Sequence, residues 1–216
     1  VLVTVTADEL DNENMIKMPI VLANLEFWQK VVKAGVEERE RLQKLAEKEK
    51  KQTGEYIRPI VLIQTEQEKE DKKKIYIQQV VDFLKKECKV KAEEIGIKTS
   101  TTDTISDVDL LSENCKIKYI LTVYALQEGW DNPFPYVLAS IANIESRISV
   151  EQMIGRIMRL PNQKKKKNTD LNQAYVIVSS RKFEDAASAL VKGIQQHGYS
   201  AKHVIQKGKK SEEINV

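Results

Sequence analysis

Cysteine and histidine are scarce in this 216-residue chain, which has two of each. Cys88 and Cys115 lie far apart with no Cys-x-x-Cys pairing, and His197 and His203 lie well downstream of both. This spacing does not match that of a zinc site. We therefore expect both thiols to be reduced and structural, and the sequence predicts no metal site.

Long apolar runs are also missing. No run approaches the roughly 18 residues that span a bilayer, and neither a signal peptide nor a lipidation motif is present. We therefore expect a cytoplasmic protein. The chain opens at Val1, inside an apolar run, which suggests a piece of a longer protein.

The chain has no large excess of charge of either sign. Its 35 Lys and Arg against 32 Asp and Glu leave a net charge of +3, so bulk charge does not identify a nucleic-acid partner. Any nucleic-acid surface must be local. The apolar share of 41% is enough to build a buried core.

Continuous apolar runs alternate with amphipathic helical patterns along most of the chain. The runs predict strands at 60–63, 119–123, 136–141 and 174–178, with weaker signals at 1–5, 20–22 and 95–97. The helical patterns fall at 25–52, around 77–84, and at 103–112, 150–159 and 183–194. Covered strands that alternate with such helices predict an α/β fold with a largely parallel sheet.

The predicted helix at 25–52 loses apolar residues steadily toward its end, where Glu, Lys and Arg dominate. We expect a helix whose first turns are buried and whose last turns are solvated. A solvated charged helix and a partner-docking helix both remain open. We divide the chain into the strand or strands and long helix of 1–55, which are part of the main unit or packed on it, the main unit of 56–200, and a polar tail of 201–216.

The helix predicted at 150–159 is fully amphipathic. On a helical wheel its apolar residues fall on one side, opposite Gln152, Arg156 and Arg159. Gly155 lies beside the arginines, where the missing Cβ would let a ligand approach the backbone. Two guanidinium groups one turn apart suit the oxygens of a phosphate, although a solvated basic face is the alternative.

The order Gln152-Met153-Ile154-Gly155-Arg156-Ile157-Met158-Arg159 resembles the QxxGRxxR motif VI of superfamily 2 helicases and translocases. The resemblance implies a second RecA-like lobe, whose sheet has helices on both faces. It implies that Arg156 is an arginine finger and that Arg159 contacts phosphate or the partner lobe. Gln152 and Gly155 would then meet the nucleotide. ATP and Mg²⁺ would be held mainly by a preceding RecA-like lobe of the same polypeptide.

A companion loop, Glu128-Gly129-Trp130-Asp131-Asn132-Pro133, follows a predicted strand, and we expect it at that strand's carboxyl end. It resembles motif V, which implies that Gly129 and Asp131 line the nucleotide cleft; a plain turn capped by Asp131 is the alternative. Together with Leu160-Pro161, the loop looks most like the restriction subunit of type III restriction-modification enzymes. That resemblance implies double-stranded DNA and a modification methyltransferase subunit as partners.

Three more polar features are candidates for contact with nucleic acid. Gln64 and Thr65 end a predicted strand that is similar to motif IV, and Thr122 lies one residue before the position where the family often has a threonine. Lys164 and Lys165 belong to a run of four lysines that we expect to be extended and solvated. That run is either a passive surface loop or a contact to the phosphate backbone.

Several motor parts are absent from the sequence. It contains no GxxxxGK[ST] loop, no acidic box after a convincing strand, and no PD…(D/E)xK nuclease motif after residue 180. We therefore expect the isolated chain neither to hydrolyse ATP nor to cleave DNA. A lobe of an RNA or DNA-repair helicase, or a non-catalytic nucleic-acid-binding module, are the alternative functions.

Overall fold

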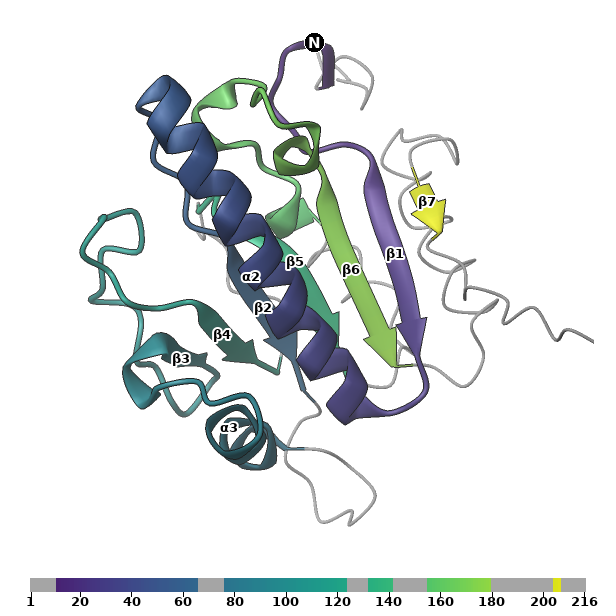
Figure 1. Ribbon diagram of the computed structural model, residues 1–216. Helices are drawn as coiled ribbons and strands as arrows, with labels where there is room; N and C mark the ends of the chain where they lie inside the picture. Colours follow the sequence, from purple (N-terminus) through teal and green to yellow (C-terminus); the bar gives the residue numbers. More distant parts are fainter. Residues whose placement is uncertain (1–10, 66–75, 124–131, 142–154, 180–203, 207–216) are drawn as a thin grey trace, which may run out of the picture.

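The computed structural model describes residues 11–65, 76–123, 132–141, 155–179 and 204–206. Seven strands form one sheet in the order β3-β4-β2-β5-β6-β1-β7, and each pair of neighbours is parallel (Figure 1). The strands are β1 Ile20–Leu25, β2 Ile60–Gln64, β3 Ile95–Lys98, β4 Tyr119–Thr122, β5 Pro135–Ser140, β6 Ala174–Ser179 and β7 Val204–Gln206. This arrangement confirms the α/β fold and is consistent with a RecA-like domain.

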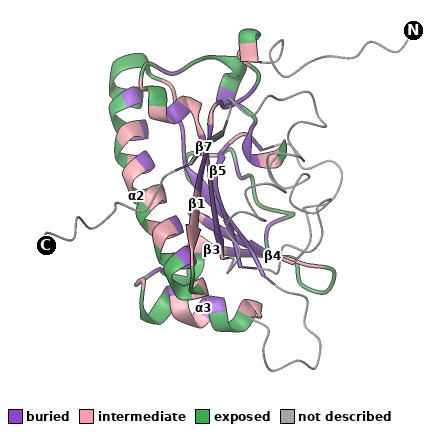
Figure 2. Ribbon diagram, turned by 90° about the vertical axis from the view of Figure 1, so that its right-hand side faces the viewer, coloured by how far each residue is buried: buried purple, intermediate pink, exposed green. Residues whose placement is uncertain are grey.

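Two α-helices, α2 Trp28–Thr53 and α3 Ile77–Lys86, lie together on one side of the sheet (Figure 2). Short 3₁₀ helices occupy Ala92–Glu94, Pro161–Gln163 and Thr169–Asn172, and residues 155–157 are also helical. Within the described ranges, no helix has the length and apolarity that a membrane crossing needs.

The central strands are buried along their whole length, as the continuous apolar runs predict. Alternate residues of β2 enter two clusters: Val61 and Ile63 pack with α2 and α3, whereas Ile60 and Leu62 pack on the opposite face. On that opposite face the described cover includes Ile105 and residues 157–158. The helix predicted at 183–194 and the strand predicted at 1–5 lie outside the described residues.

β1 and β7 join the same sheet as the rest of the strands, although the sequence division places them in 1–55 and in the tail of 201–216. β1 lies between β6 and β7. The segment just before β1 therefore reaches the amino-terminal edge of the sheet, where it meets the arginine-bearing residues described below.

The late half of α2 differs from the prediction, because it is not solvated on all sides. Leu42, Ala46 and Glu49 of this half are buried, and Arg39 just before it is buried as well. The Arg39 Nε donates to the Pro59 carbonyl at 3.1 Å, and Gly35 allows close approach to the sheet, since a Cβ there would lie 3.4 Å from that of Ala139. One face of α2 thus packs against the sheet to its end, and the expectation of a late solvated half is wrong for that face.

The helix predicted at 103–112 is also wrong, because turns and bends occupy this segment. The Asp103 Oδ1 accepts from the Ile105 amide at 3.1 Å, and the Asp109 Oδ1 accepts from the Leu111 amide at 3.0 Å. Side chains that bond to a backbone amide two residues on compete with helical hydrogen bonds. The two aspartates therefore favour turns over the predicted helix.

Candidate functional site

The described part of the arginine-bearing segment keeps the predicted segregation. Ile157 and Met158 are buried, Gly155 and Arg159 are exposed, and Arg156 is half-buried. Gln152 lies outside the described residues. The apolar side of the segment therefore packs on the sheet, while Arg159 is exposed and Arg156 is half-buried.

The helix ends earlier than the sequence predicts. Helical structure stops at 157, and Arg159 forms an antiparallel bridge with Ile16. The Leu160 amide donates to the Met15 carbonyl at 3.0 Å. A residue that precedes proline disfavours helical backbone, so Pro161 contributes to this early end.

The two arginines lie within electrostatic reach of each other. Burial lowers the pKa of the Arg156 guanidinium, and the positive charge of Arg159 lowers it further. Within the described part of the chain, the Arg156 Nε is buried and has no hydrogen-bond partner. Buried donors are nearly always satisfied in folded proteins. Two neighbouring guanidinium groups with an unsatisfied donor are suited to an anion such as phosphate.

Gly155 is not required by the packing of the chain. A Cβ at this position would meet no heavy atom of the described residues within 4 Å, and Gly54 is the glycine with positive φ in these ranges. Glycine in a helix costs about 1 kcal/mol relative to alanine. The open space over Gly155 agrees with the close approach of a ligand that the sequence predicts.

Lys17 organises this region, and the sequence analysis missed it. Its Nζ is fully buried and donates to four backbone carbonyls, those of Pro133, Pro135 and Ile157 at 2.8 Å and that of Arg159 at 2.5 Å. A single lysine before a strand carries no motif, so no sequence signal could have revealed it.

Opposing effects act on the ionisation of Lys17. Burial lowers the pKa of its ammonium well below the ordinary value, and the nearby charge of Lys166 lowers it further. Four carbonyl oxygens and the Tyr136 ring, whose centroid lies 4.1 Å from Nζ, favour the charged form.

Most of the loop that resembles motif V lies outside the described residues, including Gly129 and Asp131. Its end, Asn132 and Pro133, lies at the amino-terminal end of β5, where Lys17 binds the Pro133 carbonyl. Because β4 and β5 are both parallel to β2, their connection must return to this edge. We expected the loop to start at the carboxyl-terminal edge of the sheet. Its end lies at the opposite, amino-terminal edge.

Gln64, Thr65 and Thr122 come together at the carboxyl-terminal edge of the sheet. Gln64 pairs with Thr122 in register, and the Thr65 amide donates to the Thr122 carbonyl at 2.9 Å. The Gln64 Oε1 also accepts from the Ser140 hydroxyl at 2.9 Å. Their exposed fractions are only 5%, 1% and 2%, so direct contact with a phosphate would need the covering residues to move. Their nucleic-acid role stays a prediction.

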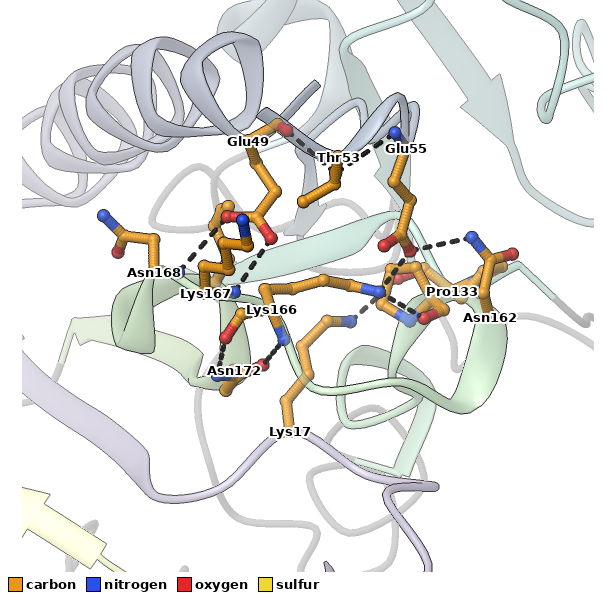
Figure 3. A network of polar contacts seen from close by, with 12 residues as sticks. Lys17, Glu49, Thr53, Glu55, Pro133, Asn162, Lys166, Lys167, Asn168 and Asn172 are labelled. Atoms are coloured by element: carbon orange, nitrogen blue, oxygen red, sulfur yellow. Dashed lines mark hydrogen bonds and ion pairs between the residues drawn. The ribbon is translucent and has the colours of Figure 1, made fainter. Parts of the chain in front are cut away.

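The lysine run is only partly solvated. Lys164 and Lys165 are exposed, and Lys165 pairs with Asp11 at 2.9 Å. Lys166 is buried, forms an ion pair with Glu55, and donates to the Pro161 carbonyl at 2.7 Å (Figure 3). The expectation of a fully solvated run is wrong at Lys166, because Glu55 beyond the end of α2 provides a buried partner for its charge.

Glu49, in the last turns of α2, holds the next part of this loop. Its carboxylate accepts from the amides of Lys167 at 2.8 Å and Asn168 at 3.2 Å (Figure 3). The Asn172 side chain accepts from the Lys166 amide at 2.7 Å and donates to the Lys166 carbonyl at 2.9 Å. The loop that follows the arginines is thus folded against α2.

No protein-family model matches the chain, and no curated protein is significantly similar to it. Assignment of a function therefore rests on the motif resemblance and on the geometry above. That geometry defines an α/β protein with an exposed Arg159 and a half-buried Arg156 near one edge of a parallel sheet.

Proposed function

We propose that this chain is the second motor lobe of an ATP-dependent DNA helicase or translocase. The observation that carries the proposal is the pair Arg156 and Arg159. The charge of Arg159 lowers the pKa of Arg156, the Arg156 Nε lacks a partner among the described residues, and no described atom would crowd a Cβ at Gly155 beside them. The residue order that resembles motif VI supports the same conclusion.

In this proposal a preceding lobe holds ATP and Mg²⁺, and the arginine pair completes the site from the opposite side of a cleft. Arg156 offers permanently charged donors to the oxygens of the transferring phosphoryl group. An arginine finger stabilises the charge of the transition state and contributes about 10³ to 10⁵ in rate. Closure and opening of the cleft would then move the nucleic acid.

The two groups of candidate residues lie at opposite edges of the sheet. The arginine-bearing segment meets the amino-terminal edge through Lys17, whereas Gln64 and Thr122 end their strands at the carboxyl-terminal edge. This separation supports a lobe that contacts nucleotide and nucleic acid at different places. Lys164, exposed in the loop after the arginines, would add a contact that depends on salt.

The finer assignment is the restriction subunit of a type III restriction-modification enzyme, an ATP hydrolase and deoxyribonuclease that acts with a modification methyltransferase subunit. It is supported by the order Glu-Gly-Trp-Asp-x-Pro at 128–133 and by Leu160-Pro161 after the arginines. A nuclease motif downstream in the parent protein and a neighbouring methyltransferase gene would support it. Their absence would favour a helicase without restriction activity.

The proposal is tested by Arg156→Ala in the full-length protein, with Arg41→Ala as the matched control. Arg41 lies on α2, where it pairs with Glu38 and Asp170 and donates to the Tyr175 hydroxyl. Its variant therefore controls for the loss of a guanidinium to which the proposal gives no role, with turnover corrected for the folded fraction. We expect Arg156→Ala to lower nucleic-acid-stimulated ATP hydrolysis by at least about 10³ while ATP still binds. Near-normal turnover in Arg156→Ala would overturn the proposal.

A further inference from the structure

We infer that Lys17 is a positioning residue for the arginine pair, a conclusion that rests on the proposed function. Lys17 belongs neither to the segment that resembles motif VI nor to the loop that resembles motif V. Its ammonium nevertheless bonds to the described end of each segment. It is buried, and its Nζ lies within hydrogen-bond distance of carbonyls from both segments.

Two of the four acceptors, Pro133 and Pro135, flank the start of β5, and the other two, Ile157 and Arg159, lie where the arginine helix ends. An ammonium group has three N–H donors and serves these four oxygens at 2.5 to 2.8 Å. The contact therefore holds the end of the helix at a set distance from a central strand.

The backbone around Lys17 reinforces this hold. The Lys17 amide donates to the Met158 carbonyl at 2.5 Å, and Ile16 forms its bridge with Arg159. The segment before β1 is thus hydrogen-bonded to the arginine-bearing residues through both its main chain and the Lys17 side chain. A displacement of about 1 Å at a reacting centre can cost roughly 10²-fold in rate. A guanidinium that must meet a phosphoryl group depends on such placement.

The described bonds of the Lys17 ammonium are to carbonyls rather than to a carboxylate, which distinguishes it from Lys166 and its partner Glu55. Its charge therefore serves to join two backbone segments. Arg39 offers a matched comparison: it is equally buried and donates to the Pro59 carbonyl, but it lies on α2, which covers the face opposite residues 157–158.

The test compares Lys17→Met with Arg39→Met in the full-length protein, by steady-state ATP hydrolysis with nucleic acid present. We expect Lys17→Met to lower kcat at least about 10-fold with KM for ATP changed less than about three-fold, because the arginines act in the transition state. We expect Arg39→Met to keep kcat within about two-fold of wild type once the folded fraction is accounted for. Equal effects on kcat in the two variants would overturn the inference.

If Lys17→Met does not fold, Lys17→Arg and Arg39→Lys replace the pair, since each keeps a cation. The longer guanidinium fork cannot reproduce the four contacts of an ammonium. We expect a folded Lys17→Arg to lose at least about three-fold in kcat with KM unchanged, and Arg39→Lys to lose none. Wild-type kcat in a folded Lys17→Arg would overturn the inference.

Arg156→Ala, measured in parallel, distinguishes a failure of the proposed function from a failure of the positioning role of Lys17. If Arg156→Ala turns over normally, the proposed function fails and the inference fails with it. If Arg156→Ala is inactive but Lys17→Met behaves like Arg39→Met, only the positioning role fails. In the Arg156→Ala background, Lys17→Met should cost less than the roughly 10-fold expected in the wild type, because part of its effect acts through Arg156.

Discussion

Gly155→Ala should act in opposite directions on stability and on activity. A Cβ at Gly155 would meet no atom of the described part of the chain within 4 Å, and the backbone there is not in the left-handed region. The new methyl group is therefore free of strain in the chain itself. It projects, however, into the space where we propose that a nucleotide approaches the helix.

The expected gain in stability follows from helix propensity. Glycine is less favourable than alanine by about 1 kcal/mol in a helix interior, and unfolded-state entropy alone accounts for about 0.4–1 kcal/mol. Because helical structure stops at 157, Gly155 lies near a helix end and the gain should be at the lower limit. We expect the free energy of unfolding of the chain to rise by roughly 0.5 kcal/mol.

Urea unfolding of the 216-residue chain measures the first effect, with Gly96→Ala as the control. A Cβ at Gly96 would lie 2.4 Å from the Ile105 Cγ2, so that variant should lose about 1–3 kcal/mol through overpacking. ATP hydrolysis by the full-length protein measures the second effect, and we expect Gly155→Ala to reduce it. The reasoning is refuted if Gly155→Ala destabilises the chain, or if it leaves turnover at the wild-type level.

Two further predictions concern buried charge and ionisation. Lys166→Met should lower the free energy of unfolding by about 1–3 kcal/mol, because it removes the ion pair with the partly buried Glu55, which keeps a bond from the Asn162 Nδ2. Lys164→Met should change it by less than about 0.5 kcal/mol; similar urea midpoints for the two would contradict the assignment of Lys166 as buried. Burial raises the pKa of Tyr119 and of Tyr175 from 10.0 to about 12, so the unfolded chain loses these protons first as pH rises. The stabilisation is complete below pH 10 and should fall between pH 10 and about 12, whereas the tyrosinate absorbance of these two residues in the folded protein should rise only near pH 12. A flat stability profile between pH 10 and about 12 would count against it.

Much of the sheet follows from local sequence. The runs at 60–63 and 174–178 are short, continuous and apolar, and their length and β-branched residues favour a covered strand over a buried helix, so β2 and β6 were predictable. Ile157 and Met158 were likewise predictable as buried, because helical periodicity places them opposite Arg156.

The polar interior was not predictable, because its partners are distant in sequence. Lys17 is buried by carbonyls more than 100 residues away along the chain, and Lys166 by Glu55. No residue close in sequence to either lysine indicates these partners, and a lysine in a polar run is ordinarily exposed. The turns at 103–112 had a local cause in Asp103 and Asp109, which a closer reading of side-chain competition with the backbone could have found.

The central claim is that Arg156 stabilises the transition state of ATP hydrolysis. The most direct measurement compares the affinity of full-length wild-type and Arg156→Ala protein for ADP and for ADP with aluminium fluoride, which mimics the transferring phosphoryl group. We predict that Arg156→Ala binds ADP as the wild type does but binds the transition-state mimic at least about 10²-fold more weakly. Equal affinity of the two proteins for the mimic would contradict the account.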